Sequence, residues 1–392
     1  MRILALTALF LIHFGSAQFA AAAGPPLCST IFSGAPWGTL RPDFKHNTGY
    51  TKEIPQSTAI KNQCNLGTCH MHSWLASIEK SYAQRTGDVI TLSNHYESAQ
   101  QLLNRSLAQL KFKDLKVKIE LGASPLISRD SILEYGVIPE GVWSPKTEFY
   151  KNPTAQKIQE YLENIVARSK WLAEKATTPA ERIHHLETGA QQIKDLLNDV
   201  IGDLPTQFEY QGRSWTPQEF AKTYFSFFEG PQTMMLVQRI RNKPTSESIE
   251  GIDTKINTDI DTVETKTASL IDQGSMVYLS YEHHAEYVDK SSGIMSIRAF
   301  YTPSYAKPLN REARDAFKKN DGGHAVQIIG YERNPETGQI IKWKIKNSWG
   351  TGSGDEGYYH MYNDYFRAFT KGVTFTTENL RPIPLKMPVK SQ

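Results

Sequence analysis

One cysteine in this sequence stands where its thiol could act as a nucleophile. Cys69 follows Gly67 and opens a stretch without glycine or proline, whose apolar residues recur at helical spacing. A cysteine in the first turn of a helix faces the positive end of the helix dipole, which favours the reactive thiolate over the thiol. Gln63, six residues earlier, carries an amide that could donate a hydrogen bond to an oxyanion. The same pattern also fits an inert buried thiol, so the rest of the chain must decide between the two.

A histidine and an asparagine late in the chain supply the two groups that such a thiol needs. His324 lies in the motif 322–326, just before a predicted strand, and Asn347 follows the next predicted strand. If these strands pair as a hairpin, the two side chains are neighbours and the asparagine amide can fix the histidine ring. Trp349, two residues after Asn347, can cover that hydrogen bond from water. A thiol, a base and an orienting amide together predict nucleophilic acyl transfer.

The cysteines and histidines around position 69 also raise the question of a metal site. Possible zinc ligands in this stretch are Cys64, Cys69, His70 and His72. Their spacing is unlike that of a zinc finger or ribbon, and no second ligand pair lies elsewhere in the sequence. We therefore predict no metal and no other cofactor.

The elements that must position these residues fall into an early helical half and a late strand-rich half. Hydrophobic periodicity predicts helices over residues 69–84, 93–110, 128–135, 154–176 and 179–201. The last begins with a capping box of Thr178 and Glu181, and we expect its apolar stripe to contain Ile183, Leu186, Ala190, Ile193, Leu197 and Val200. Strands are predicted over 277–281, 325–331 and 340–346, with an edge strand over 372–375. The long helices 154–176 and 179–201 form a predicted helical hairpin.

Length and composition are those of an ordinary globular protein. The chain has 392 residues, of which 39% are hydrophobic and 22% charged, with a formal net charge of +3. That length is enough for one large domain or two smaller ones. The sequence contains no run of five or more like charges, so nothing in it indicates nucleic-acid or membrane-surface binding.

The beginning of the chain has the pattern of a signal peptide. Arg2 precedes an apolar run over residues 3–14, which small residues follow. The run is too short to span a bilayer, so we predict cleavage of residues 1–23 and a secreted or periplasmic protein.

The chain has an odd number of cysteines, which are Cys28, Cys64 and Cys69. In an oxidising compartment this predicts one reactive thiol, with either a disulfide between Cys28 and Cys64 or two unpaired thiols.

These motifs resemble those of the papain superfamily of cysteine peptidases. The resemblance assigns the oxyanion glutamine to Gln63, the nucleophile to Cys69, the imidazole to His324 and the asparagine to Asn347. It implies an α+β fold with a helical left domain, a β-barrel-like right domain and the site in the cleft between them. It also implies a Cys69 thiolate paired with a His324 imidazolium, which attacks peptide or protein substrates and forms an acyl-enzyme.

One branch of that superfamily is similar over more of the chain. His324 and Asn347 lie much later than the roughly 130–150 residues after the nucleophile that papain-like sequences show. The extra residues resemble the bleomycin hydrolase and aminopeptidase C branch, as do the segments 92–96, 134–139, 204–208, 215–220 and 342–350. The resemblance implies one peptidase domain over residues 24–392, with a helical insertion at about 150–230.

Several residues depart from the family pattern near the expected substrate. The resemblance places substrate binding at Gly122, Ala123, Gly323 and His70, where His70 replaces the usual aromatic residue and Gly122-Ala123 the usual glycine pair. The His70 ring could form part of the primed-side wall or titrate beside the thiol. Relatives in this branch are usually cytosolic aminopeptidases whose C-terminal tail enters the cleft. We expect an aminopeptidase-like enzyme that could form a homo-oligomer. The alternatives are an endopeptidase with an open cleft, an inactive peptide-binding relative and a thiol acyltransferase.

Overall fold

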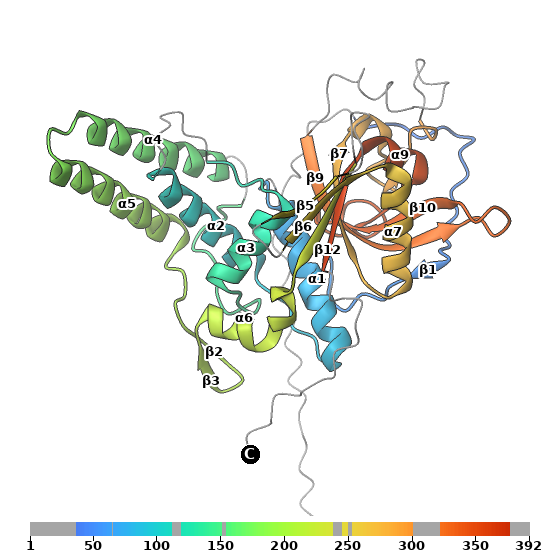
Figure 1. Cartoon of the computed structure of the whole chain (residues 1–392), viewed down its shortest axis with the longest axis horizontal. Coiled ribbons are helices and arrows are strands. Elements are labelled where there is room, and N and C mark those ends of the chain that lie inside the picture. The colour runs from blue at the N-terminus through green and yellow to red at the C-terminus, as the bar shows by residue number, and fades with distance from the viewer. Residues whose placement is uncertain are drawn as a thin grey trace, which may run out of the picture.

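The computed structural model describes residues 37–64, 66–111, 119–150, 154–237, 245–249, 253–300 and 322–376. The predicted signal peptide, Cys28 and the C-terminal tail lie outside the described residues. Figure 1 shows helices gathered on one side of the molecule and a large sheet on the other, and this α+β arrangement agrees with the predicted fold class.

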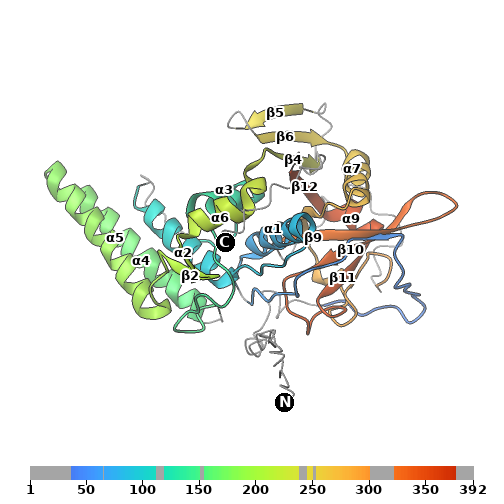
Figure 2. The same cartoon turned by 90° about the horizontal axis from the view of Figure 1, so that it is seen from below.

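Three helices near the nucleophile were predicted and are confirmed. They are α1 (Cys69–Thr86), α2 (Asn94–Gln109) and α3 (Pro125–Tyr135). Helix α3 begins three residues earlier than expected, because Pro125 occupies its first turn and the Ser124 side chain accepts a hydrogen bond from the Ile127 N–H. Helix α1 lies between the other helices and the sheet (Figure 2).

The predicted helical hairpin is also present. Helices α4 (Thr154–Lys175) and α5 (Pro179–Ile201) pack side by side and extend away from the sheet (Figure 1). Thr178 caps α5 as predicted, and the Glu181 side chain accepts hydrogen bonds from the N–H and the hydroxyl of Thr177. The expected apolar stripe is wrong at Ile183, whose side chain is 55% exposed, because the first turns of α5 lie at the outer end of the hairpin.

Short elements connect the hairpin to the sheet. Strands β2 (Phe208–Tyr210) and β3 (Arg213–Trp215) form a small antiparallel pair before α6 (Pro217–Phe225) and the short 3-10 helix η1 (Ser226–Glu229). Helix α6 has a complete capping box, in which the Thr216 side chain and the Glu219 side chain each bond the other residue's backbone N–H.

The sheet is a mostly antiparallel, open layer. Its strands, in the order β5-β6-β4-β12-β7-β9-β10-β11-β8, are β5 (Thr245–Ile249), β6 (Asp253–Thr258), β4 (Gln232–Val237), β12 (Thr370–Thr376), β7 (Val277–His283), β9 (Gly322–Arg333), β10 (Ile340–Lys346), β11 (Tyr358–Tyr362) and β8 (Ile294–Met295). Strand β1 (Lys52–Glu53) also pairs with β9. The order does not close on itself, so the β-barrel-like detail of the prediction is not confirmed.

Strand β12 corrects one prediction. It was expected at an edge of the sheet, but it pairs with β4 on one side and β7 on the other. Strands β4, β5 and β6 were not predicted from the sequence, and they extend the sheet beyond β12. Figure 2 shows them at the side of the sheet away from β10 and β11.

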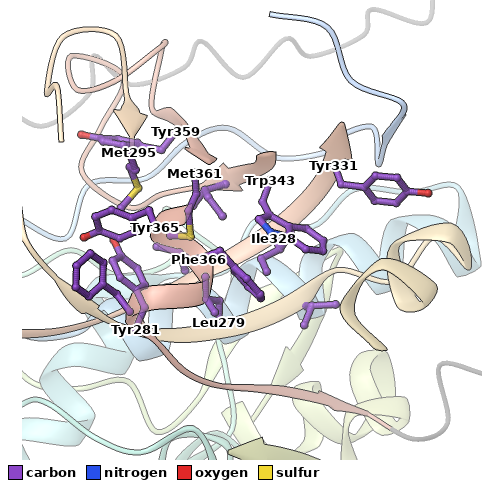
Figure 3. Close-up of a cluster of buried hydrophobic side chains, with 14 of the residues drawn as sticks. Leu279, Tyr281, Met295, Ile328, Tyr331, Trp343, Tyr359, Met361, Tyr365 and Phe366 are labelled. Carbon is purple, nitrogen blue, oxygen red and sulfur yellow. The ribbon is translucent and has the colours of Figure 1, made fainter. Parts of the chain in front are cut away.

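The two faces of the sheet are covered by different helices. Along β7, Leu279 and Tyr281 face a large core, whereas Tyr278 faces α1. Helices α7 (Ile260–Asp272) and α9 (Asn363–Phe369) complete the large core, part of which Figure 3 shows. Burial on both faces holds β9 firmly, and this strand carries His324.

Candidate active site

Cys69 is the first residue of α1, and its side chain is 8% exposed. The Thr68 side chain makes no cap hydrogen bond, which leaves first-turn N–H groups for the sulfur. Burial raises the pKa of the Cys69 thiol to about 11, while hydrogen bonds with the backbone N–H groups of Ala325, His70 and Cys69 itself act in the opposite direction. The contact with Ala325 brings the sulfur against β9, one residue after His324.

The histidine and asparagine are joined as the hairpin prediction required. Strands β9 and β10 pair antiparallel, and His324 Nε2 lies 2.8 Å from Asn347 Oδ1. The amide oxygen also accepts a hydrogen bond of 2.8 Å from the Ser348 N–H. With Nε2 donating to Asn347, Nδ1 of a neutral His324 ring is the nitrogen that can accept a proton.

Trp349 covers the buried imidazole. The two rings stack with centroids 4.5 Å apart and planes at 23°. Burial lowers the pKa of His324 to about 4, and the hydrogen bond with Asn347 acts in the opposite direction. Considered as separate groups, the thiol and the imidazole are therefore both uncharged near neutral pH, and their attraction as an ion pair would have to offset the cost of burial.

Gln63 is buried beside these groups. Its side-chain nitrogen donates to the Leu66 carbonyl at 2.8 Å, and its side-chain oxygen accepts from the Ser348 hydroxyl at 2.6 Å. Ser348 therefore links Gln63 to the segment that carries Asn347, a role that sequence reasoning missed. Because an amide nitrogen carries two hydrogens, the bond to Leu66 still leaves Gln63 a second hydrogen to donate.

A buried ionic cluster lies under the site. Lys346, the residue before Asn347, donates to the Thr58 carbonyl at 2.9 Å, and the Thr58 hydroxyl donates to Glu79 at 2.7 Å. Glu79 also pairs with Lys61 at 2.6 Å. The cluster ties β10 to α1 and to the segment that precedes Gln63. The alternation of β10 places Lys346 on the face opposite Ile345, and nothing in the sequence showed that this face is buried as well or which partners it meets.

His70 does not occupy the place expected of a substrate contact. Its ring is 1% exposed; one nitrogen lies 2.6 Å from the Leu121 carbonyl and the other 2.5 Å from the Ser128 hydroxyl. The ring thus has no nitrogen left for a substrate. Burial lowers the pKa of His70 to about 4, so the ring does not titrate near neutral pH, contrary to the expectation that it could titrate beside the thiol. The ring instead anchors Leu121, next to Gly122.

The other expected substrate residues lie on two separate segments. Gly122 is exposed and Ala123 half-buried on the extended stretch before α3, and Arg105 of α2 donates to the Gly122 carbonyl at 2.7 Å. A side chain at Gly67 would come within 3.3 Å of the Gly122 nitrogen, so the approach of these two segments favours glycine at position 67. Gly323 lies on β9, beside His324. Their contact with a substrate stays a prediction.

The cysteines divide into one free and one paired residue. Cys69 is free and Cys64 is disulfide-bonded. The predicted partner, Cys28, lies outside the described residues.

Within the described ranges, no group of three or more His, Cys, Asp or Glu side chains is arranged to hold a metal ion. No helix among the described residues has the length and apolar character needed to cross a membrane.

Known proteins are similar to this chain over much of its length. The model of the Peptidase C1-like family matches residues 128–383. Aminopeptidase C of Listeria monocytogenes is 22% identical over 265 residues, which cover 61% of this chain and 59% of the relative. Aminopeptidase E of Lactobacillus helveticus is 21% identical over 351 residues, 79% of each chain. The chain thus spans less than two thirds of the Listeria relative.

A solved structure shares the fold. The crystal structure of PepW from Lactobacillus rhamnosis superposes with a TM-score of 0.70, covering 86% of this chain and 83% of that one at 19% identity. The likeness confirms the α+β architecture with its helical and sheet halves.

Proposed function

The chain belongs to the Peptidase C1-like family of papain-like cysteine peptidases, and from this premise we propose that it hydrolyses peptide bonds with Cys69 as nucleophile and His324 as base. The observation that carries the proposal is the 2.8 Å hydrogen bond between His324 and Asn347 beside a free thiol at a helix N-terminus. These parts come from opposite ends of the chain, and an inert buried thiol would not require them.

Each residue has a defined part in the proposed reaction. His324 Nδ1 takes the thiol proton, and the resulting thiolate attacks the substrate carbonyl as the thiolate–imidazolium pair forms. The Cys69 N–H and the second hydrogen of the Gln63 amide stabilise the oxyanion. The imidazolium then gives its proton to the leaving amine, and water hydrolyses the acyl-enzyme. Asn347 holds the ring in the required tautomer, and Trp349 keeps water from their hydrogen bond.

The substrate class follows from the relatives. Aminopeptidases C and E are named for removing N-terminal residues, and this supports an aminopeptidase-like specificity for the present chain. An endopeptidase is the second candidate, since the tail that could restrict the cleft lies outside the described residues. The signal-peptide pattern of residues 1–23 supports a secreted or periplasmic enzyme.

A thiol-reactive epoxide inhibitor tests the catalytic proposal. We expect it to modify Cys69 in the folded, reduced protein and to abolish peptide hydrolysis, whereas Cys69→Ala takes up no label and has no activity. Absence of labelling in the folded wild type would rule out the proposed nucleophile and leave a peptide-binding relative.

Peptides with free and blocked N-termini distinguish the two specificities. An aminopeptidase cleaves only the free peptides. Equal cleavage of the blocked peptides would show an endopeptidase.

A further inference from the structure

The rings around the catalytic histidine include one from the N-terminal segment of residues 37–53. Trp349, which stacks on His324, meets the edge of Trp37 with centroids 6.1 Å apart and planes at 77°. His283 of β7 completes the group, with its ring centre 5.6 Å from Trp37 and 5.3 Å from Trp349. We propose that Trp37 is a positioning residue for the base: by covering Trp349, its indole keeps water from the hydrogen bond that orients His324. This proposal rests on the proposed peptidase function.

Trp37 lies on the solvent side of this group of rings. Its side chain is partly exposed, whereas His283, Trp349 and His324 are all buried. The Lys290 ammonium group lies 5.5 Å from the centre of the Trp37 ring. A hydrogen bond is stronger in a dry surrounding of low dielectric, and water competes for its donor and acceptor. An indole that excludes water from this side therefore favours the fixed ring orientation that the base requires.

Backbone contacts hold Trp37 in this place. The N–H of the next residue, Gly38, donates to the Ala285 carbonyl at 2.9 Å. A side chain at position 38 would come within 2.2 Å of the Glu286 carbonyl oxygen, so this close approach requires glycine. Three residues further on, the Arg41 N–H donates to the Ala299 carbonyl at 2.9 Å. The position of the indole is therefore set by the segment that carries it.

The other end of the same segment is joined to the strand of the base. Strand β1, at residues 52–53, pairs antiparallel with β9, and the following Ile54 N–H donates to the Ile329 carbonyl at 2.8 Å. His324 lies on β9, five residues before Ile329. Residues 37–53 thus contact both the strand that carries the base and the tryptophan that covers it, which suits a role in holding the base.

The pKa of His324 is a direct measure of this role. Titratable groups near the ring are Cys69 and His72 of α1, together with Tyr281 and His283 of β7. Burial has the larger influence and lowers the pKa of His324 from 6.5 to about 4. Water admitted by loss of the covering indole would make the charged ring less costly, so this pKa should rise. Loss of an aromatic ring elsewhere in the segment should leave it unchanged.

Two substitutions of Trp37 and one control test the effect on the reaction. Trp37→Ala removes the ring, and Trp37→Phe keeps an aromatic edge. The matched control is Phe44→Ala, because Phe44 lies on the same segment and packs edge-on against Tyr362, with centroids 5.2 Å apart. We expect Trp37→Ala to lower kcat about fivefold or more with a smaller change in KM, and the other two variants to change kcat at most about twofold. Thermal melting confirms that each variant is folded.

NMR of the histidine rings reads the pKa of His324 without any need for turnover. The measurement uses protein with Cys69→Ala, so that the thiol does not titrate, and His324→Gln identifies the signal. We expect Trp37→Ala to raise the pKa of His324 by about 0.5 or more and Phe44→Ala to leave it unchanged. If Trp37→Ala does not fold, Trp37→Leu, which keeps an apolar side chain without a ring, takes its place with the same expected results.

The outcomes separate this proposal from the proposed function. An unchanged pKa of His324 or an unchanged kcat in the folded Trp37 variant would overturn the positioning role. Equal losses of kcat in Trp37→Ala and Phe44→Ala would overturn it as well, because they would show a general effect of the segment on stability. Absence of both hydrolysis and epoxide labelling in the wild type would instead overturn the proposed function, while the NMR comparison would still show whether Trp37 shields the histidine.

Discussion

Removing the Asn347 side chain tests the proposed orientation of the catalytic base. Its oxygen lies 2.8 Å from His324 Nε2, and the side chain is buried. A hydrogen bond to a group that becomes charged contributes about 1.5–3 kcal/mol. The bond gains strength when the imidazolium forms, so Asn347→Ala should lower kcat by about 10- to 150-fold with a smaller change in KM. The pKa of His324 should also fall further below its usual value, because the Asn347 bond acts to raise it.

Asn347→Asp is the matched control, since a carboxylate oxygen can still accept from His324. We expect it to retain more activity than the alanine variant and to raise the pKa of the imidazole through its negative charge. The assay is kcat and KM for the same peptide as a function of pH, with thermal melting to confirm that both variants fold. A loss of kcat below about threefold in a folded alanine variant would refute the assigned role of Asn347.

Two further predictions concern buried titrating groups. Burial raises the pKa of Cys69 to about 11, so alkylation of the free enzyme by iodoacetamide should speed up about tenfold per pH unit from pH 7 towards pH 10; a rate that stays level down to pH 5 would show that the ion pair with His324 already exists at rest. Burial lowers the pKa of Lys346 from 10.5 to about 8, so the unfolded chain binds more protons between these values and the free energy of unfolding gains up to about 3 kcal/mol as pH rises across that window. Lys346→Met should remove this gain in pH-dependent denaturant unfolding; an equal gain in the wild type and the variant between pH 8 and pH 10.5 would contradict the lowered pKa of Lys346.

The sequence allowed the catalytic residues to be proposed because local patterns mark them. Cys69 opens a periodic helix, and His324 and Asn347 adjoin two alternating strands joined by a turn, so the elements and their hairpin follow from neighbours in the chain. The interior place of β12 could not be predicted in the same way. It depends on pairing with β4, a strand more than a hundred residues earlier whose pattern gave no signal of its own.

The directions of individual side chains could not be predicted from the sequence either. His70 follows the nucleophile directly, yet its ring turns away to Leu121 and Ser128, some fifty residues further along the chain. The sequence places His70 in the first turn of α1, but the direction of its side chain depends on the partners that the fold brings to it. The link from Gln63 to Ser348 has the same origin, since it joins segments from the two ends of the chain.

The ionic cluster under the site should govern the rate for every substrate. Lys346 and Asn347 are consecutive; the Lys346 side chain is bonded to Thr58, whose hydroxyl donates to Glu79, and the Asn347 side chain is bonded to His324, so the cluster holds the backbone that aims the base. Lys61 extends the cluster, because its side chain pairs with Glu79 at 2.6 Å and its carbonyl accepts from the Gly350 N–H at 2.9 Å. Damage to the cluster should therefore lower kcat for every substrate.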